Sequence, residues 1–336
     1  MVQGHIAVLG AGAWGTALSL VFANKGERVV LWTRQSEHAR DIQETRENRR
    51  LFPGFALPET VDITSSVEQA LPGADAVVLA LPTTAVRQIV EQAAPHLPEG
   101  VPVVTASKGI ESSSLMLMSE VIEDVLGPTI RDRCAFLSGP SFAKEVAEQM
   151  PTTVVMAATN YQLSEALQQR FATERLRIYA SDDPIGVQVG GALKNVIAIA
   201  AGACDGLGFG HNTRAALITR GLAEIARLAI AKGGNVLSLA GLAGLGDLVL
   251  TCNSDLSRNR TLGFEMARGR KPQEALAWLG HVAEGAETAK SAYRLAETLG
   301  VELPICAEVY QVLYEGKPPA RAVQEVLSRP LKREWG

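Results

Sequence analysis

A short apolar run followed at once by a glycine-rich turn constrains the fold of this chain more than any other feature. Residues 6–9 read IAVL, a wholly apolar stretch that is typical of a central parallel strand buried on both faces. The turn GAGAWG follows at residues 10–15, a helix is expected over residues 16–24, and Gly26 stands where a helix commonly ends. A second strand is expected over residues 28–32. This order predicts an α/β fold that begins with a strand–helix–strand unit.

The three glycines of the turn have the spacing G-x-G-x-x-G of a dinucleotide-binding fingerprint, in the structural context that the fingerprint requires. Gly10 permits the tight turn, Gly12 lets a pyrophosphate approach the backbone, and Gly15 lets the helix pack close to the strand. The N–H groups at the start of the helix can then bind the phosphates. We interpret the turn as a nucleotide site; the alternative is a glycine-rich turn without a ligand.

The second strand ends without the acidic residue that usually holds the ribose 2′-hydroxyl of NAD. Arg34 follows instead, and its guanidinium can bind the 2′-phosphate of NADP, while Thr33 can add a neutral hydrogen bond. We therefore expect NADPH to be the preferred cofactor and NADH a possible one. The alternative for Arg34 is a solvated loop residue, and its stacking on adenine would also help NADH.

Helical and strand patterns alternate through the amino-terminal half and predict a doubly wound, mostly parallel Rossmann-type sheet. One helix is expected over residues 35–50, and Ser141 is expected to cap a helix that follows it. The strand expected over residues 101–106 delivers Lys108 at its carboxyl end, where open parallel sheets bind ligands. Lys108 is therefore a candidate functional residue, although a lysine after a strand is often only solvated.

Strand patterns cease near Asp183, and a helical period continues to the end of the chain. The sequence therefore predicts two domains. They are a dinucleotide-binding domain of residues 1–182 and an all-α domain of residues 183–336, which would bind the substrate and carry the catalytic group.

The stretch GGALKN at residues 190–195 opens a long apolar helix and places one ammonium group on it. Residues at helical spacing from Lys194 share its face, and Gly190, Ala198 and Ala201 on that face are small. A lysine on such a stripe has room for another group beside it and can exchange a proton with that group. The alternative is a lysine whose stem covers the core and whose head reaches water.

Two further stretches carry candidate chemistry. GLAGLGD at residues 241–247 is interpreted as a close-packed bend that aims Asp247, because it lacks the preceding strand and the Lys-Ser or Lys-Thr pair of a phosphate loop. SRNR at residues 257–260 places two cations and an amide close together. This motif is either an exposed turn or an anion cradle, because arginine makes bidentate contacts to phosphate.

Composition and charge argue against several other classes of protein. The formal net charge of −4 disfavours an electrostatic nucleic-acid binder. The four cysteines are far apart, which favours free thiols in a reducing compartment and indicates no metal site. We expect neither a signal peptide nor a membrane span, because the apolar runs are short or interrupted by glycine. The expected location is the cytoplasm.

The chain resembles the NAD(P)-dependent glycerol-3-phosphate dehydrogenases of bacterial type in a series of motifs that occur in order. They are GAGAWGTAL at 10–18, SKG at 107–109, SGPSFAKE at 138–145, GVQVGGALKNVIAIAAG at 186–202, AGLGDLVLTC at 243–252 and SRNR at 257–260. The resemblance covers nearly the whole chain. It implies reversible reduction of dihydroxyacetone phosphate to sn-glycerol 3-phosphate, which supplies glycerophospholipid synthesis, and it implies a homodimer.

The resemblance also implies roles for individual residues. Lys194 would be the proton donor and acceptor, supported by Lys108 and Asp247. The residues implied in cofactor binding are Gly10, Gly12, Ala13, Trp14, Gly15, Arg34, Lys108, Ala143, Arg258, Val282 and Glu284. Those implied in substrate binding are Lys108, Gly139, Ser141, Lys194, Asn195, Asp247, Ser257, Arg258 and Asn259. The family often has serine in place of Ala13, but alanine keeps the backbone N–H.

Three functions are compatible with these features. They are a phosphate-polyol dehydrogenase, a hydroxyacid or ketoacid reductase with the same two-domain plan, and a nucleotide sensor without catalytic activity. The SRNR motif favours the first over the second, because an unphosphorylated substrate would not need it. Lys194 and Asp247 argue against the third, because a sensor needs no proton donor.

Overall fold

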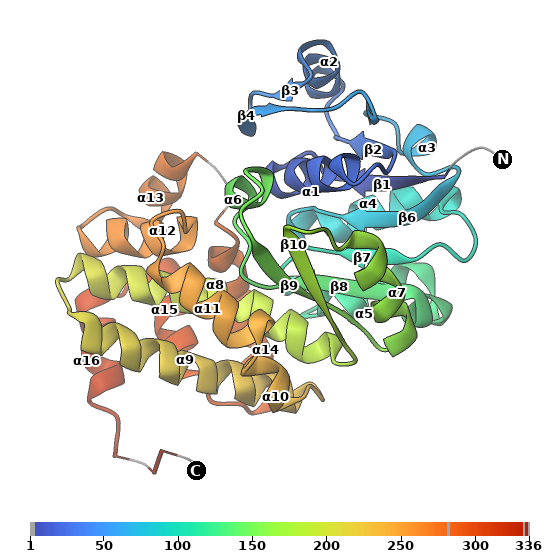
Figure 1. Ribbon diagram of the computed structural model, residues 1–336. Coiled ribbons are helices and arrows are strands. Elements are labelled where there is room, and N and C mark those ends of the chain that lie inside the picture. The colour runs from blue at the N-terminus through green and yellow to red at the C-terminus, as the bar shows by residue number, and fades with distance from the viewer. Residues whose placement is uncertain (1–3, 281–282, 332, 335–336) are drawn as a thin grey trace. The chain divides into compact units, whose positions relative to one another are not determined.

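The protein is seen in a computed structural model that describes residues 4–280, 283–331 and 333–334. The chain divides into two compact units (Figure 1). The first unit consists of Met1–Glu111 and Met116–Gln188, and the second of Ser112–Leu115 and Val189–Gly336. The division falls inside helix α8 (Pro184–Gly206).

The first turn of α8 is bonded to the first unit, which explains why the division lies beyond Asp183. The side-chain oxygen of Gln188 accepts a hydrogen bond from the backbone N–H of Ser119, and its amide nitrogen donates to the Ser119 hydroxyl. The helix thus starts in one unit and continues into the other, whereas the sequence pattern places the boundary where helical periodicity begins.

An eight-stranded sheet forms the centre of the first unit, with the strand order β10-β9-β8-β7-β6-β1-β2-β5. Its strands are β1 (His5–Leu9), β2 (Val29–Trp32), β5 (Val61–Thr64), β6 (Ala74–Leu79), β7 (Val103–Thr105), β8 (Cys134–Ser138), β9 (Thr152–Ala158) and β10 (Leu176–Ser181). Neighbouring strands run parallel except for β8 and β9. The doubly wound, mostly parallel sheet predicted from the sequence is confirmed.

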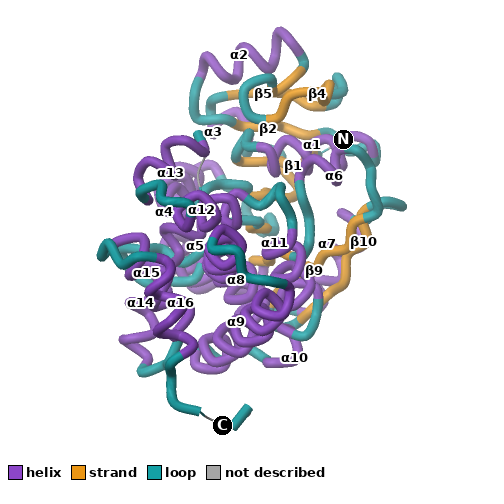
Figure 2. Tube along the Cα trace, turned by 90° about the vertical axis from the view of Figure 1, so that its left-hand side faces the viewer, coloured by secondary structure: helices purple, strands orange, loops and turns teal. Residues whose placement is uncertain are grey.

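Helices cover both faces of this sheet, which is why its central strands are almost wholly apolar. Figure 2 shows α4 (Thr83–Ala93) and α5 (Met118–Leu126) on one face, and α1 (Ala13–Asn24), α6 (Ala143–Ala147) and α7 (Tyr161–Phe171) on the other. The short helix α3 (Val67–Ala70) precedes β6. Because β1, β2, β6, β7 and β8 run in the same direction, the loops at their carboxyl ends share one edge of the sheet.

The single helix expected over residues 35–50 is wrong over its last five residues, 46–50. Helix α2 (Ser36–Thr45) ends because Arg46 adopts a left-handed backbone conformation with φ of 53°. The Arg46 guanidinium donates to two backbone carbonyls near the start of β5, a tertiary contact that local pattern does not contain. The chain then forms an antiparallel pair, β3 (Glu47–Asn48) with β4 (Phe52–Ala56).

The second unit is helical in its described residues, so the predicted all-α carboxyl-terminal domain is confirmed. Its helices after α8 are α9 (His211–Ala231), α10 (Val236–Leu239), α11 (Asp247–Asn253), α12 (Arg258–Ala267), α13 (Pro272–Leu279), α14 (Glu284–Leu299), α15 (Pro304–Tyr314) and α16 (Pro319–Leu327). A π-helical turn, Leu242–Gly246, precedes α11. The middle of α8 is buried among these helices.

Glycines determine how closely other elements approach α8. A Cβ atom added to Gly202 of α8 would lie 1.8 Å from a backbone oxygen of α12, and one added to Gly263 of α12 would lie 1.9 Å from a backbone oxygen of α8. A Cβ atom on Gly190 would lie 2.7 Å from the carbonyl oxygen of Ala243, in the turn before α11. Backbone-to-backbone packing thus brings α11 and α12 against the part of α8 that carries Lys194.

Two helical segments, Pro184–Gly206 and Val236–Asn253, are long and apolar enough to cross a membrane by length and composition alone. Within the first segment, 89% of the apolar window is buried inside the protein, as in the core helix of a globular protein. The corresponding share of the second is 39%. Core helices pass the same test, so these segments are weak evidence for a membrane span.

Candidate functional site

The glycine-rich turn of the first unit has the geometry that its sequence predicts. Gly10 has a φ of 123°, and a Cβ atom there would lie 2.3 Å from the Ala80 carbonyl oxygen. A Cβ atom on Gly15 would lie 1.8 Å from the Gly10 oxygen, so α1 packs directly on the turn. By contrast, nothing lies within 4 Å of a Cβ atom added to Gly12. The turn is therefore closed on the side of the sheet and open at the start of α1.

The start of α1 suits an anionic ligand. Ala13 and Trp14 are its first residues and are partly buried. No side chain caps this end of the helix, and its first turn contains no acidic residue. Backbone N–H groups without intrahelical partners therefore face the open side of the turn at Gly12. These residues fit the pyrophosphate of a dinucleotide.

The end of β2 presents one buried and one exposed side chain. Thr33 is 7% exposed, and its backbone N–H donates to the carbonyl of Thr64. Arg34 follows and is exposed. Thr33 and Arg34 thus follow the strand whose end faces the ribose in dinucleotide-binding folds, and they place a hydroxyl and a cation there, with no acid.

Lys108, Gly139 and Ser141 come together at the carboxyl ends of β7 and β8. The Lys108 ammonium donates to the Gly139 carbonyl at 3.2 Å, and the Ser141 hydroxyl donates to the same oxygen at 3.0 Å. The expected capping role of Ser141 is wrong. Phe142 is the N-cap of α6 and has no polar side-chain atom, and the Ser141 hydroxyl donates to the Gly139 carbonyl instead of accepting from the helix. Ala143 is the first residue of α6.

A buried ion pair lies at the centre of the second unit. The Lys194 ammonium of α8 donates to Asp247 Oδ1 at 2.5 Å and to the Thr251 hydroxyl at 3.1 Å. The Thr251 hydroxyl in turn donates to the backbone carbonyl of Asp247 at 2.6 Å. The close-packed bend inferred from the sequence precedes Asp247: a Cβ atom added to Gly244 would lie 2.2 Å from the backbone oxygen of Leu239, so the bend leaves no room for a side chain there. Sequence reasoning did not identify Thr251.

The neighbour of Lys194 on α8 takes part in a second polar cluster. Asn195 Oδ1 accepts from the side-chain amide of Asn259 at 2.9 Å, and Asn259 Oδ1 accepts from the backbone N–H of Gly285 at 3.0 Å. Ser257 caps α12 by accepting from a backbone N–H of its first turn. Glu284 is the first residue of α14, whereas Val282 lies outside the described residues.

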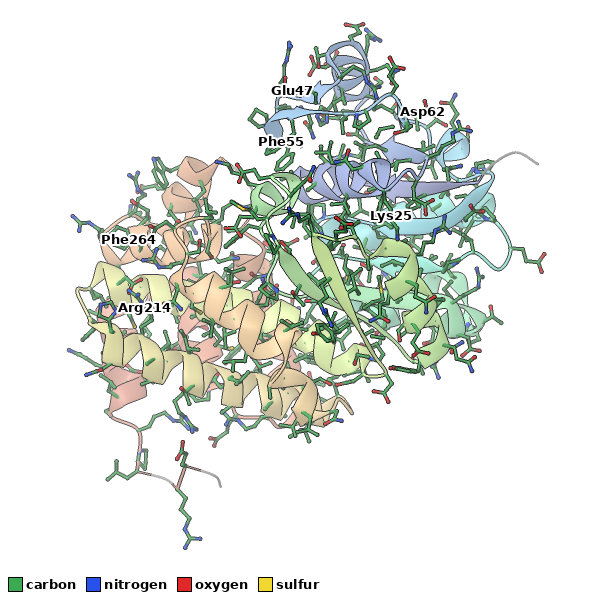
Figure 3. All side chains as sticks on the ribbon, in the orientation of Figure 1. Lys25, Glu47, Phe55, Asp62, Arg214 and Phe264 are labelled. Atoms are coloured by element: carbon green, nitrogen blue, oxygen red, sulfur yellow. The ribbon has the colours of Figure 1, made fainter. Side chains whose placement is uncertain are left out.

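The two arginines of the SRNR motif have different environments. Arg260 donates to Asp205 at 2.9 Å and to Asp255 at 2.5 Å, and Asp205 is also paired with Arg214, labelled in Figure 3. Arg258 is exposed and forms no hydrogen bond or ion pair within the part of the chain that is described. The motif therefore supplies one cation to the surface rather than two, since the other holds α12 against α8.

The thiols of the molecule are not candidates for this chemistry. Burial raises the pKa of the Cys252 thiol to about 12, although the positive charge of Lys194 acts in the opposite direction. Burial also raises the pKa of Cys134 to about 12 and that of Cys204 to about 11. These thiols stay protonated at neutral pH and are weak nucleophiles. Within the described residues, no group of three or more histidine, cysteine, aspartate or glutamate residues could hold a metal ion.

Comparisons with known proteins cover both units. Residues 5–164 match the amino-terminal part of the NAD-dependent glycerol-3-phosphate dehydrogenases, and residues 183–324 match the carboxyl-terminal part of the same family. The chain is 51% identical to a glycerol-3-phosphate dehydrogenase (NAD(P)+) of Anaeromyxobacter dehalogenans, over 97% of this chain and 98% of that protein. It is 50% identical to the corresponding protein of Geobacter sulfurreducens, over 98% of both chains.

A solved structure resembles the whole chain. It is the crystal structure of a glycerol-3-phosphate dehydrogenase from Coxiella burnetii, which is 40% identical in sequence. The superposition has a TM-score of 0.93 and covers 97% of this chain and 99% of that one.

Proposed function

The chain belongs to the family of NAD-dependent glycerol-3-phosphate dehydrogenases, and we propose that it reversibly reduces dihydroxyacetone phosphate to sn-glycerol 3-phosphate with NAD(P)H. It is an oxidoreductase that acts on a secondary alcohol and the corresponding ketone. The product is the glycerol phosphate unit of glycerophospholipids, so the enzyme supplies their synthesis.

The ion pair between Lys194 and Asp247 is the observation that carries this proposal. Bound NAD(P)H supplies a hydride to the carbonyl carbon of the substrate. The carbonyl oxygen then gains negative charge, and Lys194 donates a proton to it. Asp247 and Thr251 hold the ammonium in one position, so that no reorganisation is needed when the charge develops. In the reverse direction Lys194 takes the proton from the alcohol.

The remaining groups of the site bind the substrate and the cofactor. Arg258 binds the substrate phosphate, because it is the exposed arginine of its motif, and Lys108 stabilises negative charge on the substrate. The other residues proposed for the substrate are Gly139, Ser141, Asn195, Ser257 and Asn259. Those proposed for the cofactor are Gly10, Gly12, Ala13, Trp14, Gly15, Lys108, Ala143, Arg258, Val282 and Glu284. We further propose a cytoplasmic homodimer.

A substrate panel tests the reaction. Purified protein is assayed for oxidation of NADPH and NADH with dihydroxyacetone phosphate, with dihydroxyacetone and with small 2-keto acids. We expect turnover with dihydroxyacetone phosphate and at least about tenfold lower kcat/KM without the phosphate, because a charged hydrogen bond contributes about 1.5–3 kcal/mol. Turnover with keto acids alone would identify a ketoacid reductase, and a lack of turnover with every substrate would identify a sensor.

Cofactor preference is the second part of the proposal. NADPH is preferred because Arg34 is exposed at the end of β2 and can pair with the 2′-phosphate. A charged contact of about 1.5–3 kcal/mol predicts a kcat/KM for NADPH that is roughly ten- to a hundredfold higher than that for NADH.

A charge-reversal variant tests the role of Arg34. Arg34→Asp adds repulsion to the loss of attraction and should erase or invert the preference for NADPH. Arg175→Asp, another exposed arginine of the first unit, is the matched control and should leave the ratio unchanged. An unchanged ratio in Arg34→Asp would exclude Arg34 as the phosphate ligand.

A further inference from the structure

A chain of buried polar side chains links the end of β2 to the glycine-rich turn. The Thr33 hydroxyl lies 3.1 Å from Nδ1 of His38, and Nε2 of His38 lies 2.9 Å from Oδ1 of Asn48. The Asn48 amide nitrogen lies 2.9 Å from the carbonyl oxygen of Ala11 and 2.8 Å from the hydroxyl of Thr16. Thr16 and Asn48 are fully buried, and His38 is nearly so. Figure 3 labels Glu47, which precedes Asn48 in β3.

The orientation of the Asn48 amide is fixed by its neighbours. Its nitrogen must face the Ala11 carbonyl, because a reversed amide would place two acceptor oxygens against each other. Its oxygen accepts from the backbone N–H of Leu51 at 3.2 Å. A reversed amide would place its NH₂ group against this N–H, so that two donors would face each other. Both observations give the same orientation, with Oδ1 directed at His38.

This orientation determines where the hydrogen atoms of His38 and Thr33 lie. An amide oxygen only accepts, so Nε2 of His38 carries the hydrogen that is donated to Asn48. In a neutral imidazole the other nitrogen, Nδ1, is then an acceptor. With His38 neutral, the Thr33 hydroxyl donates its hydrogen to that nitrogen. The hydroxyl oxygen retains its lone pairs and has no hydrogen left for the 2′-phosphate bond that the sequence suggests.

We propose that the Thr33 hydroxyl oxygen, fixed as an acceptor by His38 and Asn48, accepts a hydrogen bond from the 2′-hydroxyl of the adenine ribose of NADH. Thr33 directly follows β2, where dinucleotide-binding folds specific for NAD place an acid that accepts from this hydroxyl. Its side chain is bonded toward the glycine-rich turn through His38 and Asn48. Thr33 therefore acts as an uncharged acceptor, which does not repel a phosphate as an acid does. His38 and Asn48 are positioning residues.

The inference rests on the proposed use of NAD(P) and explains how one site serves both cofactors. Arg34 pairs with the 2′-phosphate of NADPH, and Thr33 accepts from the 2′-hydroxyl of NADH. The two residues are neighbours in the sequence, and Arg34 does not belong to the series of buried hydrogen bonds that joins Thr33, His38 and Asn48. Substitutions that affect the Thr33 acceptor should therefore act on NADH more than on NADPH.

Comparison of NADH with 2′-deoxy-NADH tests the acceptor directly. A neutral hydrogen bond contributes about 0.5–1.5 kcal/mol, so the wild type should bind NADH roughly three- to tenfold more tightly than the deoxy analogue. Thr33→Val has the same shape without the hydroxyl and should lose this discrimination, while Thr33→Ser keeps it. The dissociation constants are measured by tryptophan fluorescence as well as from KM, so failure of turnover with dihydroxyacetone phosphate would not obscure the result.

His38 variants test the positioning. His38→Leu removes the acceptor for the Thr33 hydrogen and should reduce discrimination against 2′-deoxy-NADH, whereas His38→Gln offers both an acceptor and a donor and should preserve it. The proposal would be overturned if Thr33→Val discriminated between NADH and 2′-deoxy-NADH as the wild type does, whether it bound both cofactors equally well or lost affinity for both by the same factor. A dissociation constant for NADPH that rises as much as that for NADH in Thr33→Val would assign the residue a purely structural role.

Discussion

The Lys194 ammonium and the Asp247 carboxylate form an ion pair at 2.5 Å in which the two side chains are only 10% and 1% exposed. Each charge compensates the other for its loss of water, and neither is well solvated alone. The pair therefore behaves as one unit. A substitution that removes one partner changes chemistry and stability together, and experiments on this site must separate the two effects.

Lys194→Ala should lower kcat by at least about 10²- to 10⁴-fold, because the variant lacks the proton donor. It should leave cofactor binding nearly intact, because Lys194 is not among the residues proposed for the cofactor and the glycine-rich turn belongs to the other unit. The measurement is kcat with saturating dihydroxyacetone phosphate, together with the dissociation constant for NADPH.

The unpaired Asp247 of that variant costs roughly 3–5 kcal/mol of unfolding free energy, so stability needs its own control. The double variant Lys194→Met with Asp247→Asn removes both charges and should recover much of the thermal stability without recovering activity. Near-normal turnover in either folded variant would exclude Lys194 as the proton donor.

Thr251→Val should lower kcat with little change in KM for the cofactor. The hydroxyl bonds both the Lys194 ammonium and the backbone of Asp247, so its loss frees the ammonium to take other positions. Removal of one such bond, of about 0.5–1.5 kcal/mol, predicts roughly a three- to tenfold effect. Thr251→Ser retains the hydroxyl and should restore most of the rate. Equal rates in Thr251→Val and the wild type would show that Asp247 alone positions Lys194.

The role of Thr251 shows what local patterns leave out. Thr251 lies four residues after Asp247 on α11, so the two share one face of that helix. The sequence pattern predicts no helix at this position and places Asp247 at the end of a bend. Recognition of the short helix would have identified Thr251, because threonine in a helix commonly donates to the carbonyl four residues earlier.

Local sequence patterns predict the fold well, whereas they do not predict ion pairs and hydrogen bonds between residues that are distant in the sequence. The turn at Gly10 and the alternation of strands and helices are local signals. The two arginines of SRNR look equivalent in sequence, but the partner Asp205 that occupies Arg260 lies on another helix. The helix α5 (Met118–Leu126) was not predicted at all, although its burial on one face is that of an amphipathic helix.

Arg258→Ala should raise KM for dihydroxyacetone phosphate by about ten- to a hundredfold, because a charged contact to phosphate contributes about 1.5–3 kcal/mol. At saturating NADPH, which removes any effect of Arg258 on cofactor binding, the same substitution should hardly affect the reduction of dihydroxyacetone, which has no phosphate. Arg260→Ala is the matched comparison: it breaks the pairs with Asp205 and Asp255, and should lower the melting temperature. If Arg258→Ala slows both ketones equally, Arg258 does not bind the phosphate.

The buried residue Glu224 should make the stability of the second unit depend on pH. Its carboxylate is 1% exposed and accepts from the backbone N–H groups of Ile305 and Cys306 at the start of α15. Burial raises the pKa of Glu224 from 4.5 to about 7, although the two N–H groups act in the opposite direction. Between about pH 4.5 and about pH 7, Glu224 therefore keeps its proton in the folded protein, whereas the unfolded chain has released it.

The free energy of unfolding should therefore fall as pH rises from about 4.5 to about 7, because over this interval the folded protein binds more protons than the unfolded chain. At about 1.4 kcal/mol per unit of pKa, the Glu224 contribution is roughly 3 kcal/mol at most. Glu224→Gln cannot titrate, so the difference in stability between wild type and variant should change across this interval and be constant below it. Urea unfolding at a series of pH values measures that difference. A difference that is independent of pH would show that folding does not raise the pKa of Glu224.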